Sequence, residues 1–135
     1  MSPELDQKLC AAYPLIFRDR RSAPRETAMC WGFSCGDGWY ALIDTVCSLS
    51  MREMPGHPPV ALQVKEKFGG LSMLMHGGNQ RTRAFVEFAE VMSESVCELC
   101  GRPGKVLGNH DGGWLRVRCE TCAVAECDSY LSEEP

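Results

Sequence analysis

Hydrophobic residues recur at helical spacing in three stretches of the chain and alternate with polar residues in a fourth. The first helix is expected to begin at Ser2, because a serine hydroxyl caps a helix N-terminus and Pro3 suits the first turn. Leu5 and Leu9 lie one helical turn apart and form its inward face. Pro14 ends the helix, because its ring nitrogen cannot donate the hydrogen bond that a helix interior requires.

A second helix is expected to begin within the segment CGDG at 35–38, with Asp37 as its N-cap. The run PGHPP at 55–59 ends this helix, because prolines interrupt the backbone hydrogen bonds. Its apolar stripe is expected to face the core and consists of Trp39, Leu42, Ile43, Val46 and Leu49.

A β-hairpin is expected between residues 60 and 75, where the hydrophobic period changes to two. Gly69 and Gly70 suit a tight primed turn between its two strands. The inward positions are expected to be Val60, Leu62 and Val64 in the first strand and Leu71, Met73 and Met75 in the second.

A third helix is expected after the turn residues 77–79, and a cysteine-rich segment follows it. This order of helices, hairpin and cysteine-rich segment predicts an α+β fold. We expect residues 1–96 to form a small helix and hairpin domain and residues 97–135 to form a zinc module packed on it. The inward face of the third helix is predicted to consist of Phe85, Phe88, Ala89, Met92 and Val96.

Composition and charge narrow the classes of function. The 135 residues carry a formal net charge of −4, which disfavours a general DNA-coating protein because phosphate binding needs cations. The longest apolar runs are too short to span a membrane, and the N-terminus lacks the layout of a signal peptide. We therefore expect the protein in the cytoplasm, where its nine cysteines are thiols or metal ligands rather than disulfides.

Four cysteines have the spacing of a metal site. Cys97 and Cys100 form one Cys-x-x-Cys pair, and Cys119 and Cys122 form a second pair that is separated from the first by 18 residues. This spacing is typical of a four-thiolate zinc site, and four protein ligands make the zinc structural rather than catalytic. A hairpin is expected between the pairs and a short helix after them, an order that resembles the treble-clef class of zinc fingers.

Other cysteines and histidines are less convincing ligands. Cys127 lies about 140° around a helix from Cys122, and His110 is expected at the far tip of the hairpin. Cys30, Cys35 and Cys47 match no metal or catalytic motif, and buried cysteine is common in protein cores. A second site at these three positions therefore stays an alternative to core packing.

Several longer segments carry a resemblance to a known family. They are FRDR at 17–20, CWGFSCGDGWYALID at 30–44, QVKEKFGGL at 63–71, and CELCGRPG at 97–104 with the later GGW at 112–114. Together they resemble a family of small proteins encoded by phages and prophages, over nearly the whole chain. The resemblance implies an accessory protein that acts in the cytoplasm of a bacterial host, and it implies no catalytic residue.

These observations favour a non-enzymatic module that binds a host bacterial protein, such as a defence or transcription component. Asp37 and Tyr40 are candidate partner-binding residues, because they lie in a glycine-rich aromatic segment. The same segment is also typical of a lid over the core. The net charge, the closed zinc site and the lack of a catalytic motif support the binding interpretation.

Two alternatives remain. Arg116 and Arg118, in the hairpin between the cysteine pairs, are candidates for contacts to a nucleic acid or to a protein partner. A metal-dependent hydrolase would use Asp37, Asp44 or the carboxylates on the Glu87 face of the third helix. The spacing of Glu87, Glu90 and Glu94 is also typical of a solvated helix face.

Overall fold

The computed structural model describes residues 1–108 and 114–132, and its mixture of helices and small sheets confirms the α+β class. Three short 3-10 helices, η1 (Arg18–Arg21), η2 (Ala28–Trp31) and η3 (Asp37–Trp39), precede the second long helix. The remaining elements are α1 (Pro3–Ala12), β1 (Phe33–Ser34), α2 (Tyr40–Glu53), β2 (Val60–Lys67), β3 (Gly70–His76), α3 (Gln80–Ser93), β4 (Lys105–Leu107), β5 (Arg116–Arg118) and α4 (Glu120–Ser132).

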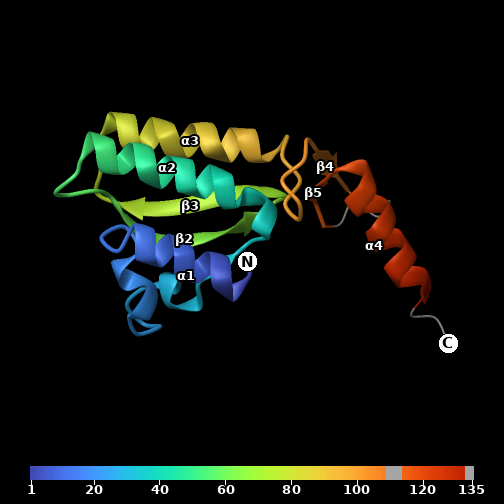
Figure 1. The fold of residues 1–135 in the computed structure, drawn as a ribbon, viewed down its shortest axis with the longest axis horizontal. Coiled ribbons are helices and arrows are strands. Elements are labelled where there is room, and N and C mark those ends of the chain that lie inside the picture. The colour runs from blue at the N-terminus through green and yellow to red at the C-terminus, as the bar shows by residue number, and fades with distance from the viewer. Residues whose placement is uncertain (109–113, 133–135) are drawn as a thin grey trace.

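Two layers make up the larger part of the molecule. The β1-β2-β3 sheet pairs β1 parallel to β2 and β2 antiparallel to β3. Helices α2 and α3 lie side by side along one side of this sheet. Helix α4 lies beyond β4 and β5 and projects away from the sheet, at the right of the view in Figure 1. None of the helices within the described ranges is long and apolar enough to cross a membrane.

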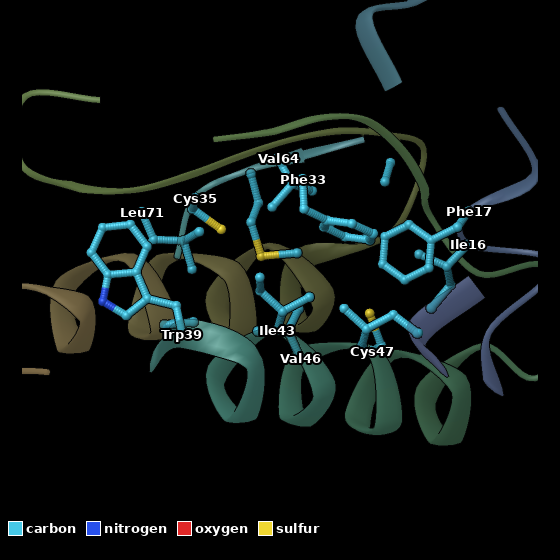
Figure 2. Close-up of a cluster of buried hydrophobic side chains, with 14 of the residues drawn as sticks. Ile16, Phe17, Phe33, Cys35, Trp39, Ile43, Val46, Cys47, Val64 and Leu71 are labelled. Carbon is cyan, nitrogen blue, oxygen red and sulfur yellow. The ribbon is translucent and has the colours of Figure 1, made fainter. Parts of the chain in front are cut away.

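The core lies between α2 and the sheet and is closed by the segment after α1. Ile43 and Cys47 on the inner face of α2, and Trp39 at its N-cap, are fully buried. Figure 2 shows Ile43 and Cys47 on the side of α2 that faces the sheet, with Trp39 at one end of the cluster. The predicted first helix is confirmed with Ser2 as its N-cap, and its inward residue Leu9 is fully buried in the same cluster.

The hairpin is confirmed, with two local differences from the prediction. A bulge between Ala61 and Gln63 shifts the register, so that Ala61 is fully buried and Leu62 is only partly buried. The turn residues are Phe68 and Gly69, with φ of 52° and 90°, rather than the Gly69–Gly70 pair. Two central residues with positive φ match the primed turn expected for a two-residue hairpin.

Helix α3 covers the edge of β3 with polar side chains. Ser93 Oγ accepts a hydrogen bond of 2.8 Å from Leu71 N, and Glu90 Oε1 accepts one of 2.9 Å from Met73 N. These bonds satisfy backbone donors that an uncovered edge strand would expose. The helix is therefore rotated from its predicted orientation, and Phe88 is 69% exposed instead of buried. Met92 is likewise exposed, whereas Ala89 is buried and Phe85 and Val96 pack against the core as predicted.

Candidate metal centre

The two Cys-x-x-Cys pairs meet at one point. The Sγ atoms of Cys97, Cys100, Cys119 and Cys122 all lie within 4.8 Å of one another, and those of Cys100 and Cys119 are 3.6 Å apart. Sulfurs around a tetrahedral zinc at about 2.3 Å stand about 3.8 Å from each other. The four thiols therefore fit a metal ion held by protein ligands alone. Within residues 1–108 and 114–132, no other group of three or more His, Cys, Asp or Glu residues gathers in this way.

Backbone N–H groups favour the thiolate form at two of the four positions. Burial disfavours the ionised form of Cys97, but hydrogen bonds from the backbone of Cys119, Cys100 and Leu99 outweigh it and lower its pKa to about 7. The pKa of Cys119 is also lowered, chiefly by the hydrogen bond from Cys122 N to its Sγ. A thiolate is the form that binds metal, so this geometry prepares both sulfurs as ligands.

Tight turns and a short sheet position the four sulfurs. Gly101 has a φ of 80° and its N–H donates to the carbonyl oxygen of Cys97 at 2.9 Å, which closes the first turn. Strands β4 and β5 pair antiparallel with Val106 opposite Val117. This hairpin returns the chain to the first pair, and α4 begins immediately after Cys119 and contains Cys122. The tight turn of Cys97 and Cys100, which we call the knuckle, is thus followed by the hairpin and the helix in the predicted order.

The segment CGDG at residues 35–38, which we call the seat, packs against this first turn. Gly36 N donates to Glu98 Oε2 at 2.9 Å, and Gly38 N donates to Glu98 O at 2.7 Å. A Cβ on Gly38 would stand 2.0 Å from Cys97 O, so no other residue fits there without displacing the backbone. The fully buried Trp39 adds a hydrogen bond of 2.8 Å from its Nε1 to Val96 O. Glycine at these positions therefore serves close backbone packing.

Ion pairs join the hairpin of the centre to α4 and to the seat. Arg118 contacts Glu126 at 2.8 Å and Glu98 at 3.4 Å, and Arg116 contacts Glu126 at 3.0 Å. Only 11% of the Arg118 side chain is exposed. Glu98 thus contacts the CGDG segment with one carboxylate oxygen and Arg118 with the other.

The candidate partner-binding residues have intramolecular contacts in this structure. Asp37 does not cap α2, because its Oδ1 accepts a hydrogen bond of 2.7 Å from Ser2 N, and Trp39 occupies the cap position. Tyr40 packs against the buried cluster, with Lys8 Nζ 5.5 Å from its ring centroid. Sequence spacing did not reveal Glu98 as a link, since its partners lie far away along the chain.

The remaining candidate ligands and nucleophiles stand apart from the centre. Cys35 and Cys47 are buried in the core, and burial raises the pKa of Cys35 to about 12. Asp44 accepts a hydrogen bond of 2.7 Å from the Tyr13 hydroxyl. Cys127 is exposed and does not belong to the cluster of four, and His110 lies outside the described residues.

Comparison of the chain with protein-family models, with curated proteins and with solved structures finds no match in any of the three. The site is therefore interpreted from its own geometry.

Proposed function

We propose that the protein is a non-enzymatic module that uses structural zinc to present a binding surface to a host bacterial protein in the cytoplasm. The observation that carries the proposal is the closed set of four thiols, which leaves a bound ion no position for a substrate or an activated water. Zinc is the ion that such a set favours, and the knuckle, hairpin and helix around it support a treble-clef assignment. The resemblance to phage and prophage proteins supports the setting.

A metal-dependent hydrolase has less support. Asp37 and Asp44 are engaged with Ser2 N and the Tyr13 hydroxyl, and they do not form a shared metal site in the described residues. Glu90 of the third helix accepts a hydrogen bond from Met73 N, so it belongs to the helix–sheet contact. Nucleic-acid binding through Arg116 and Arg118 has less support because both guanidinium groups contact acidic side chains of the same molecule.

The first experiment determines the metal and the partner together. Metal analysis of the purified protein is expected to give zinc in a one-to-one ratio to the chain. The zinc-loaded protein is then used for affinity purification from a bacterial lysate, and a retained partner is purified and titrated directly by calorimetry. A specific complex that the Cys97→Ser variant does not form is the expected result. Failure to find any protein complex, together with zinc-dependent or magnesium-dependent hydrolysis of a substrate, would contradict the proposal.

A further inference from the structure

A groove of about 780 Å³ lies between the turn of the β2–β3 hairpin and the hairpin of the metal centre. The two hairpins meet at Gly69, where an added Cβ would stand 3.2 Å from Leu115 Cβ. The groove is lined by Lys65, Glu66, Lys67 and Phe68 from the first hairpin and by Gly108, Trp114 and Leu115 from the second. The groove therefore exists only when the metal-bound hairpin is held against the larger part of the molecule.

Phe68 occupies a turn position at which a large side chain is unfavourable. Its φ of 52° makes it the only non-glycine residue with positive φ among residues 1–108 and 114–132. Asparagine, aspartate or glycine is preferred at such a position, because a bulky residue there is strained. The ring is 81% exposed, so burial does not offset the strain. Neither the turn nor the core accounts for phenylalanine here, which points to a contact outside the chain.

Trp114 faces the same groove from the other hairpin and is 73% exposed. Tryptophan is the side chain most enriched among residues that dominate binding energy at interfaces. Two large exposed rings from segments far apart in the chain thus line one groove. Scattered exposed apolar residues are ordinary, whereas two rings that line one groove form a place for a third apolar group.

Two lysines and one glutamate line the groove, which leaves a net positive charge. Lys67 Nζ stands 5.8 Å from the centroid of the Phe68 ring, and Lys65 lies two residues earlier on the same strand. Within the described parts of the chain, neither lysine forms an ion pair. The carboxylate of Glu66 is engaged by the turn, since its Oε1 accepts a hydrogen bond of 2.7 Å from Gly69 N. The two ammonium groups therefore remain available to carboxylates of a partner.

We propose that this groove binds a peptide segment of a partner protein in which a large apolar side chain is flanked by carboxylates. The apolar side chain enters between Phe68 and Trp114, and the carboxylates contact Lys65 and Lys67. The assignment rests on the proposed protein-binding function and names its surface and the chemistry of its ligand. It moves that surface away from Asp37, Tyr40, Arg116 and Arg118.

Exposed rings beside lysines also suit a single-stranded nucleic acid, whose bases stack on aromatic side chains. The charges decide against that ligand. A single strand carries a negative charge at every phosphate, and its binding depends on many cations. The groove offers two lysines, the neighbouring Arg116 and Arg118 contact Glu126, and the chain as a whole has a formal charge of −4. A short acidic peptide matches this charge better.

The test uses the full zinc-loaded chain and a surface-displayed library of random dodecapeptides. Enriched peptides are expected to share a Trp, Phe or Leu with Asp or Glu close to it. Resynthesised peptides should bind about tenfold more weakly to the Phe68→Asn and Trp114→Ala variants. Trp31→Ala is the matched control, because Trp31 is 71% exposed but does not line the groove, and binding should not change.

Three results of the peptide experiment would overturn the groove assignment. They are a library without enriched peptides, enriched peptides that lack acidic residues, and binding that neither groove variant weakens. Tighter binding of an oligothymidylate than of the selected peptides at low salt would replace the peptide with a nucleic acid. A purified partner that binds the groove variants as well as the wild type would also refute the groove, while leaving the proposed protein-binding function intact. A wild-type protein that binds no partner at all refutes that function first.

Discussion

The larger part of the molecule, residues 1–96, and the metal module that follows it acquire a fixed structure by different means. The first part buries side chains from α1, α2 and the sheet in one continuous cluster. Among the described side chains of the module, only Val117 belongs to that cluster, and the other buried ones are the ligands Cys97 and Cys119. The comparison indicates that hydrophobic burial specifies the first part, whereas the second part depends on the metal that we propose for it.

The strongest way to test this contrast is to remove the metal. Structural zinc contributes about 10 to 16 kcal/mol of apparent binding free energy in small modules, more than a core of this size supplies. Cys97→Ser, or treatment with a strong chelator, is expected to abolish hydrogen-exchange protection in residues 97–108 and 114–132. Protection of α2 and β2 should largely remain, because their core contains none of the four ligands.

Cys127→Ser provides the control for this experiment, since Cys127 is exposed and does not belong to the cluster of four thiols. It should leave both the metal content and the exchange pattern unchanged. A Cys97→Ser protein that keeps zinc and native protection in the module would show that the contrast between the two parts is wrong.

The contact between the two parts is tested by a single methyl group. Gly38→Ala places a Cβ 2.0 Å from Cys97 O, so the backbone of the seat or of the knuckle must shift. We expect a loss of about 3 kcal/mol in the free energy of unfolding, and a weaker affinity for zinc, because the displaced backbone carries a ligand. Chemical denaturation and competitive metal titration measure the two effects.

Gly56→Ala is the matched substitution, because nothing lies within 4 Å of the Cβ it adds. It should change the free energy of unfolding by no more than about 0.5 kcal/mol. Equal effects of the two substitutions would mean that the CGDG segment does not hold the knuckle in solution.

Much of this architecture could be predicted from patterns within short segments. Ser2 and Pro3 mark a helix start, and the spacing of two Cys-x-x-Cys pairs predicts that four sulfurs converge. Alternation along β2 and β3 predicts their pairing, although the bulge at Ala61 depends on packing against other elements. Signals of this kind are local, because they reflect turn geometry and hydrophobic period.

The features that sequence patterns did not predict depend on contacts between residues far apart in the chain. The orientation of α3 follows from polar bonds between Ser93 or Glu90 and the edge of β3, whereas hydrophobic period alone favours a face that includes the exposed Phe88. The role of Glu98 is likewise not visible in the sequence, because it depends on contacts with Gly36 and Arg118. The glycines of CGDG were a usable signal, since a residue that must be glycine implies a close backbone approach.

The smallest expected effect lies at the turn where the two parts meet. Phe68→Asn converts the turn to Asn-Gly, the dipeptide preferred when both central residues have positive φ. Relief of the strain at this position should raise the free energy of unfolding by about 0.5 to 1 kcal/mol, because asparagine tolerates the left-handed region. The exposed ring contributes little burial that the substitution would forfeit. Phe88→Asn, at a similarly exposed ring within α3, should instead leave the free energy of unfolding nearly unchanged, since asparagine and phenylalanine have similar helix propensities. Thermal unfolding of the two variants beside the wild type measures the difference. If Phe68→Asn lowers stability more than Phe88→Asn, the ring stabilises the folded chain itself, and its conformation gives no argument for a binding role.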